Sequence, residues 1–389
     1  MTTLNDVLTV RSIKTGPFGT QLRASEYTPF RTAEMHAVVS VGEIRSGVIA
    51  IEPRTPRVGK EVVERLPQYI LDPRDVVVSR KGTVDRSSWV DPRFGRLFLG
   101  SDAIAVRFEN ELSARAYGYV LQARASREWL IRHASGSTML SMNSEILGRL
   151  PVPILSNREM KAIVEVLGAL DDKIAANQRL VTLILELGES MVQACDLAPT
   201  ALAELATITM GTSPRGEYLN DDGIGIPFFQ GVRDFGAVYP AKRIFTLHPA
   251  RTAPDGAVLF AVRAPVGKTN LAVGDTAIGR GLASIASDSQ PATLFFSMRA
   301  FETVWDEFQG GGTVFASING SDVRSTMLPM PSGSETLRLE AKLSALLGRA
   351  TIAERESETL ANTRDELLPL LMSGKITVKD AEKQVEQEV

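Results

Sequence analysis

The chain contains the same local plan twice, and this repeat constrains the fold more than any other feature. The stretch at residues 136–143 ends in Asn and leads to a Leu-Pro-x-Pro motif at 150–153. A similar stretch at 312–319 leads to a second Leu-Pro-x-Pro motif at 328–331. Self-similarity over so long a period predicts two halves with similar folds.

A matched turn lies earlier in each copy. Apolar runs that begin at Val76 and Val258 read as buried strands entering loops. A constant offset of 182 positions aligns Lys81 with Arg263 and Arg86 with Lys268, so each copy places two cations five residues apart. A solvated hairpin with incidental charges is the alternative, but recurrence in both halves favours a functional loop. Asp85 stands where the second copy has Gly267, so we expect the turn to differ in the first copy.

Long helices are expected after both Leu-Pro-x-Pro motifs, over residues 157–195 and 335–372. Their apolar residues recur mainly in steps of three and four, which is typical of a coiled-coil seam. The seam positions are Ile163, Leu167, Leu170, Ile174, Asn177, Val181, Ile184, Leu187, Met191 and Ala194, then Leu339, Leu343, Leu346, Ala350, Ala353, Leu360, Leu367 and Leu371. A helix of about 40 residues spans about 60 Å, and each seam is expected to be buried against the other.

The remaining segments have a mixed α+β texture rather than a regular βαβ alternation. Short strands are expected at 37–41, 103–106 and 293–296, and a helical stretch at 112–133. The predicted fold is therefore α+β, with two mixed α/β domains joined by two long antiparallel coiled-coil helices in an internal pseudo-twofold repeat. The expected parts are a first domain at 1–155, a central helix at 156–198, a second domain at 199–333 and a C-terminal helix and tail at 334–389.

The sequence offers little support for catalysis. Cys195 is the single cysteine and there are three histidines, which excludes an intramolecular disulfide and a Cys-based zinc site. The Gly-Lys-Thr at 267–269 resembles the end of a P-loop, but Val262 stands where that motif needs glycine and no helix start follows. The sequence has no Gly-x-Ser-x-Gly elbow and no Asn/Asp-Pro-Pro-aromatic motif. We therefore expect no active site, metal or cofactor in this chain.

Location is inferred from what the sequence lacks. Its N-terminus does not have the basic and apolar layout of a signal peptide, and no apolar run reaches 18 residues. A cytoplasmic protein is the expectation.

Several segments carry a resemblance to a known family. They are residues 13–22 (Ile-Lys-Thr-Gly-Pro-Phe-Gly-Thr-Gln-Leu), 169–177 (Ala-Leu-Asp-Asp-Lys-Ile-Ala-Ala-Asn), 227–231 (Pro-Phe-Phe-Gln-Gly), 262–268, 278–282 and 364–374. Together they resemble the specificity subunit of type I restriction-modification systems, over essentially the whole chain. The helical segment 169–177 is the most specific match.

The resemblance implies a non-catalytic reader of DNA. Each domain would be a target-recognition domain that binds one half of a split, asymmetric target, and the helices would set the distance between the halves. Two methyltransferase subunits, carrying S-adenosylmethionine and methylating adenine, would dock chiefly along the helices. Restriction subunits, using ATP and magnesium, would join them. The alternatives are a coiled-coil scaffold whose domains bind protein, and a separated DNA-recognition module of another phage-defence or fused restriction enzyme.

The candidate DNA contacts come from the matched turns and from polar stretches after apolar runs. Arg and Lys can bind phosphates or guanine edges, while Gln can pair with adenine edges. The residues selected on this basis are Lys81, Arg86, Gln230, Arg233, Arg263, Lys268 and Arg280. A surface charge is the alternative for each one.

The charge distribution refines this expectation. The net charge of −3 argues against a DNA-binding protein when it is taken as a whole. Residues 1–155, however, carry 21 Lys and Arg against 16 Asp and Glu, whereas residues 199–333 carry 10 against 12. The first domain is therefore expected to bind DNA more strongly than the second.

Overall fold

The computed structural model describes residues 2–28, 32, 34–136, 138–310, 316–372, 375–376 and 380. The chain forms two compact units: a first unit of Met1–Lys173 with Thr359–Val389, and a second unit of Ile174–Glu358. Both divisions fall within long helices, so the expected boundaries at 155, 198 and 333 stay predictions. The repeat segment 312–315, Ser137 of the first repeat and residues 373–374 of the C-terminal motif lie outside the described residues.

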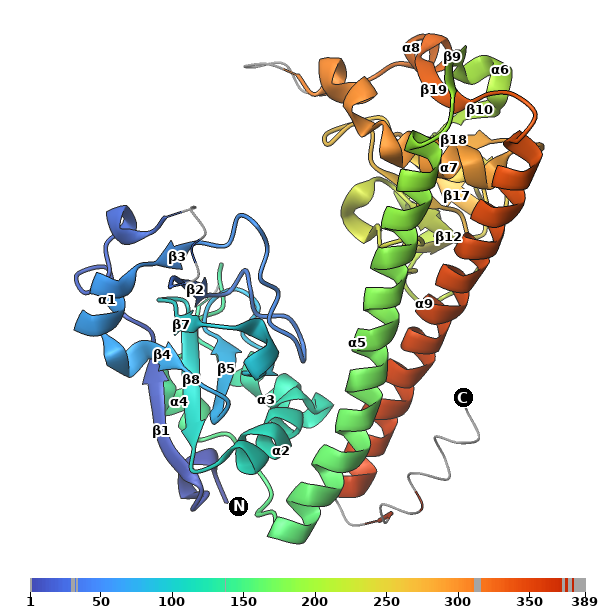
Figure 1. Cartoon of the computed structure of the whole chain (residues 1–389). Helices are drawn as coiled ribbons and strands as arrows, with labels where there is room; N and C mark the ends of the chain where they lie inside the picture. The colour runs from blue at the N-terminus through green and yellow to red at the C-terminus, as the bar shows by residue number, and fades with distance from the viewer. Residues whose placement is uncertain are drawn as a thin grey trace. The chain divides into compact units, whose positions relative to one another are not determined.

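Two four-stranded sheets form the first unit (Figure 1). One is antiparallel, in the order β1 (Val10–Thr15), β8 (Ala103–Phe108), β5 (Asp75–Ser79) and β6 (Ser87–Trp89). The other has the order β3 (Arg57–Val58), β2 (His36–Val39), β7 (Leu97–Leu99) and β4 (Ile70–Leu71), with β2 and β7 parallel. The helices are α1 (Lys60–Arg65), α2 (Glu111–Gln122), α3 (Arg124–His133) and α4 (Ser144–Gly148).

The second unit repeats this topology, except that its second sheet has a fifth strand. Its antiparallel sheet has the order β10 (Thr207–Met210), β18 (Leu282–Ala286), β15 (Val258–Ala261) and β16 (Thr269–Leu271). A second sheet has the order β11 (Leu219–Asn220), β13 (Phe245–Thr246), β12 (Ile226–Phe229), β17 (Thr276–Ile278) and β14 (Thr252–Ala253), with β12 and β17 parallel. β9 (Leu197–Ala201) pairs with β19 (Met327–Pro331). The helices are α6 (Leu202–Leu205), α7 (Pro291–Ala300) and α8 (Gly320–Ser325), and the 3-10 helices include η6 (Val232–Asp234) and η7 (Glu302–Phe308).

Two helices of 37 residues each, α5 (Asn157–Gln193) and α9 (Thr336–Met372), pack together as the sequence predicts. In the first unit Arg364 of α9 pairs with Asp171 of α5, N to O 2.8 Å. In the second unit Asn177 of α5 bonds to Glu356 of α9. Residue numbers rise along α5 as they fall along α9, so the two helices are antiparallel. The expected α+β class with paired long helices is confirmed.

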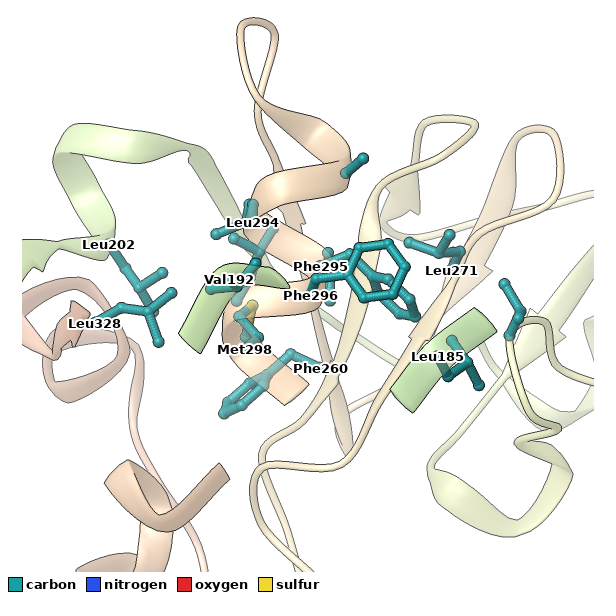
Figure 2. Packing of buried hydrophobic residues seen from close by; sticks show 14 of the residues in the cluster. Leu185, Val192, Leu202, Phe260, Leu271, Leu294, Phe295, Phe296, Met298 and Leu328 are labelled. Atoms are coloured by element: carbon teal, nitrogen blue, oxygen red, sulfur yellow. The ribbon is translucent and has the colours of Figure 1, made fainter. Parts of the chain in front are cut away.

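The C-terminal end of α5 corrects the predicted seam. Leu187 is 51% exposed and Ala194 is exposed, whereas Leu185 and Val192 are buried. Figure 2 shows Leu185 and Val192 in one apolar cluster with Phe296 of α7, so this end of α5 packs into the core of its unit as well as against α9. The predicted seam considered only the contact between the two long helices, so it did not include the residues of α5 that pack against α7.

Residues 293–296 are wrongly predicted as a strand. They lie in α7, which begins at Pro291 and buries all seven residues from Ala292 to Met298. Pro suits the first turn of a helix because it has no N–H to leave unpaired. A short apolar run does not distinguish a buried strand from a helix that is buried on every side. The expected helical stretch 112–133 forms as two helices, α2 and α3, separated at Ala123.

Candidate nucleic-acid interface

The matched cations occupy equivalent positions in the two units. Lys81 follows β5 and Arg263 follows β15 by the same number of residues, while Arg86 and Lys268 directly precede β6 and β16. Ser79 N–H donates to Arg86 O at 2.9 Å, and Ala261 N–H donates to Lys268 O at 2.8 Å. The offset of 182 read from the sequence is therefore also a structural equivalence.

The Asn-ending repeats lie against these turns. Isolated antiparallel bridges join Lys81 to Ser141 and Arg263 to Ser317. Beyond the bridges, the side chains of Asn143 and Asn319 accept hydrogen bonds from backbone N–H groups at the start of α4 and α8. Each repeat therefore pairs with a turn and then caps a short helix, which explains why both motifs recur together.

The turns themselves differ, as Asp85 indicates. Gly267 has a φ of 95°, and a Cβ there would lie 2.6 Å from Cδ1 of Trp305. Among the described residues, none other than glycine has a positive φ, so Asp85 adopts a different backbone conformation. The left-handed glycine of the first turn is Gly82, with a φ of 70°. Only the second turn needs glycine at the position aligned with Asp85.

Three of the predicted residues meet at one end of the antiparallel sheet in the second unit. We call Ser213, Gln230, Arg263 and Arg280 the second corner. Gly279 N–H donates to Phe229 O at 2.8 Å, and Val262 N–H donates to Gly281 O at 3.0 Å, so the segments carrying these residues are adjacent. The side chains of Gln230, Arg263 and Arg280 are exposed. Polar groups from separate strands therefore form one accessible surface.

Ser213 holds the centre of the second corner. Its hydroxyl donates to Oε1 of Gln230 at 2.8 Å and accepts from the backbone N–H of Arg280 at 3.3 Å. A Cβ at Gly279 would lie 2.4 Å from the same Oε1, so this glycine leaves space for the Gln230 amide. The Gln230 side chain therefore has one preferred position.

The first unit has an equivalent corner with different side chains. Gly100 N–H donates to Val39 O at 2.8 Å, as Gly279 does to Phe229, so Ser40 takes the place of Gln230. By the same alignment Ser101 takes the place of Arg280, and Lys81 that of Arg263. We call Ser40, Lys81 and Ser101 the first corner.

Basic and aromatic groups surround the first corner. Nζ of Lys81 lies 2.7 Å from an oxygen of Asp102. Arg80, next to Lys81, donates to the backbone oxygens of Met142 and Ser101 at 3.2 Å each. Its guanidinium lies 5.2 Å from the ring centre of Phe18, which is 56% exposed. This corner offers a cation, hydroxyl groups and an exposed aromatic ring.

The other predicted contacts lie apart from the corners. Lys268 pairs with Glu302 at 2.6 Å. Arg233 is exposed on η6, and no hydrogen bond or ion pair within the described ranges joins its side chain to the second corner. Arg86 is half-buried beside Asp85, and within the described part of the chain its side chain makes no hydrogen bond or ion pair. The structure therefore brings together Gln230, Arg263 and Arg280, but not all seven candidates.

Sequence reasoning missed Ser213, Ser40 and Arg80. Arg80 directly precedes Lys81 and follows the valine run at 76–78 closely, and this position is the signal that the sequence offers. Ser213 and Ser40 give no comparable signal, because their roles depend on strands far apart in the chain. Gln230 lies 17 residues from Ser213, and Arg280 lies 67 residues from it.

Burial shifts the pKa values of two groups inside the first unit. Burial raises the pKa of the Asp75 carboxyl, which nevertheless bonds to Arg107 with an Nε to Oδ1 distance of 2.6 Å. Burial also raises the pKa of Tyr119, whose hydroxyl donates to Asp171 at 2.6 Å. Over the described residues, no cluster of His, Cys, Asp or Glu is arranged to hold a metal ion. Within the same residues, no helix has both the length and the apolar character needed to cross a membrane.

Comparison with known proteins connects this architecture to a family. The family of Type I restriction modification DNA specificity domains matches residues 1–185. This match covers slightly less than half of the chain. The putative type I restriction enzyme MjaX specificity subunit of Methanocaldococcus jannaschii is 36% identical over 174 residues, which are 44% of this chain and 41% of that protein. The match therefore spans less than half the length of this curated relative.

One solved specificity subunit shares the fold over most of the chain. The crystal structure of a type I restriction-modification S subunit from M. genitalium has a TM-score of 0.53 at 14% identity, covering 95% of this chain and 94% of that one. This likeness shows a shared fold. The HsdS subunit from Thermoanaerobacter tengcongensis has a TM-score of 0.35 at 20% identity, covering 96% of each chain.

Proposed function

We propose that this chain is the non-catalytic specificity subunit of a type I restriction-modification enzyme and reads a bipartite, asymmetric DNA target. The observation that carries this proposal is the pair of corners. They occupy the same place in two units of the same topology, yet one presents Gln230 with two arginines and the other presents Lys81 with two serines. Two corners with equivalent backbone positions but different side chains are suited to recognise two different half-sites.

The second corner has groups suited to base edges. Because Ser213 donates to Oε1 of Gln230, the amide NH₂ of Gln230 is left to donate to base acceptors such as a purine N7. The exposed guanidinium groups of Arg263 and Arg280 can bind guanine or phosphate. A half-site that contains purines at adjacent positions fits this set best.

The first corner favours a different half-site. A serine hydroxyl can donate or accept a hydrogen bond, so by itself it discriminates weakly between bases. Lys81 acts as a point charge and is already paired with Asp102. Phe18 adds an exposed apolar contact for a thymine methyl group. The two halves of the target are therefore unlike, and no palindrome is expected.

Catalysis belongs to partner subunits in this proposal. Two adenine methyltransferase subunits, which carry S-adenosylmethionine, dock along the helices, and restriction subunits that use ATP and magnesium join them. Exposed apolar residues on the helices support such docking: Leu183 and Leu187, four residues apart on α5, are 53% and 51% exposed, and Ile352 on α9 is 60% exposed.

Mapping of methylated adenines tests the proposal. A host carrying this chain with a cognate methyltransferase should show a bipartite asymmetric motif that is absent when this chain is deleted. Gln230→Ala with Arg280→Ala should relax one half of the motif, and Lys81→Ala should leave that half unchanged. A methylation pattern that does not depend on the chain would contradict the proposal.

A further inference from the structure

The matched turn is ion-paired to the next helical segment in both units, but with opposite polarity. In the first unit, Arg127 of α3 donates to Asp85 of the turn at 2.9 Å. In the second unit, Glu302 of η7 pairs with Lys268 of the turn at 2.6 Å. α3 follows α2 as η7 follows α7, so the two segments occupy the same place in chain order. The segment beside the turn supplies a cation in one unit and a carboxylate in the other.

The charged residues of the two segments differ in the same way as these ion pairs. α3 carries arginine at 124, 127 and 132, with Glu128 as its single acidic residue. η7 carries Glu302, Asp306 and Glu307 and has no basic residue. The segment beside the turn is therefore acidic in the second unit and basic in the first.

The basic residues of α3 stand on a well-anchored helix. Leu130 is fully buried, and the buried Ser126 hydroxyl donates to Val120 O at 2.7 Å. The rings of Trp129 and His133 stack at 3.9 Å. Arg124, Arg127 and Arg132 are exposed. We call Arg124, Arg127 and Arg132 the α3 face.

We propose that the α3 face contacts the phosphate backbone of duplex DNA beside the half-site read by the first unit, and that the second unit has no corresponding contact. This inference rests on the proposed function. Guanidinium groups bind phosphate oxygens through charge-assisted hydrogen bonds. Asp85 and Glu128 already pair with two of these arginines. The three side chains together are therefore expected to neutralise fewer than three phosphate charges.

The salt dependence of DNA binding isolates this contact, because each neutralised phosphate contributes about 0.9 to the slope of log K against log salt. The test uses the full-length chain with two duplexes of equal length, one carrying the motif returned by methylation mapping and one without it. Arg124→Gln/Arg132→Gln removes two charges and leaves the Asp85–Arg127 pair intact. Asp306→Asn/Glu307→Gln is the matched control, since it removes two exposed charges from the equivalent segment.

The arginine variant should lower the slope by about 1 to 2 for both duplexes and weaken both to a similar extent. The control should leave the slope unchanged, and neither variant should alter the methylated motif. An unchanged slope in the arginine variant, with target discrimination retained, would overturn this inference alone. A wild-type chain that binds both duplexes equally would instead contradict the proposed function, while the comparison of slopes would still decide whether the α3 face binds phosphate.

Discussion

The side-chain amide of Asn177 on α5 donates to Oε2 of Glu356 on α9 at 2.7 Å, inside a seam that is otherwise largely apolar. Asn177 is 4% exposed, so this polar layer is shielded from water. A buried asparagine in a coiled-coil seam lowers stability and specifies the register of the helices. The Asn177–Glu356 pair thus ties the alignment of α5 and α9 to a specific contact.

Removing one partner of this pair should be more harmful than removing both. Asn177→Ala leaves the half-buried Glu356 carboxylate without this donor, and we expect a loss of about 1–3 kcal/mol in the free energy of unfolding. Asn177→Leu/Glu356→Leu should recover that loss, because apolar residues often replace a buried polar pair without cost. Denaturant titration measures the free energies of unfolding of the single and the double variant, and Gln178→Ala, at an exposed position, is the control. Equal stability of the single and double variants would contradict a coupled pair.

The repeat was predictable from sequence because aligned residues have the same structural role in both copies. Val84 and Val266, aligned by the offset, are both fully buried beneath their turns. Asn143 and Asn319 both cap helices. Such requirements keep similar residues at similar spacing, so two copies can be aligned without a structure.

The corners and the reversed ion pairs were not predictable in the same way. The bond between Ser213 and Gln230 depends on how the two sheets of the second unit meet, and Lys268 and Glu302 are 34 residues apart in the sequence. The strand predicted at 293–296 failed for a related reason, since burial on every side of α7 removes the helical periodicity. These contacts and the conformation of residues 293–296 depend on tertiary packing, which a local sequence pattern does not specify.

Ser213 should act on DNA recognition through Gln230. Ser213→Ala removes the donor to Oε1, so the amide loses its preferred orientation, and we expect about fivefold weaker binding to the target, equivalent to about 1 kcal/mol. Gln230→Ala should cost about 1–3 kcal/mol in discrimination at one base pair. Fluorescence anisotropy with target and single-substitution duplexes measures both changes. Ser325→Ala, at an exposed serine of α8, is the control. A Ser213→Ala variant with wild-type discrimination would refute the positioning role.

Arg263 and Lys268 should contribute unequally, although the repeat aligns both with cations of the first unit. Arg263 is exposed, whereas Lys268 is already paired with Glu302. Arg263→Ala should therefore lower the salt slope by about 0.9, and Lys268→Ala by less. Binding titrations at several salt concentrations give the slopes. Unchanged affinity and slope in both variants would remove these residues from the phosphate contacts.

Glu354 on α9 should make the second unit less stable as pH rises. Burial raises the pKa of its carboxyl above the ordinary 4.5, although Val238 N–H donates to it at 3.1 Å. The folded state then holds this proton to a higher pH than the unfolded state, so stability falls as pH rises above about 4.5 and through the folded pKa. Glu354→Gln keeps an acceptor and cannot ionise. Its stability relative to wild type should increase from pH 4 to pH 7 in denaturant titrations, whereas the exposed Glu358→Gln should show no such trend.

The paired helices should set the spacer between the two half-sites. Removing seven residues from each of α5 and α9 preserves the phase of the seam and shortens each helix by about 10 Å. At about 3.4 Å per base pair, the preferred spacer should become about three base pairs shorter. The measurement is the methylated motif of the shortened variant, compared with a variant carrying seven-residue insertions, whose spacer should lengthen by the same amount. Recovery of the original spacer in both variants would show that the helices do not determine the distance between half-sites.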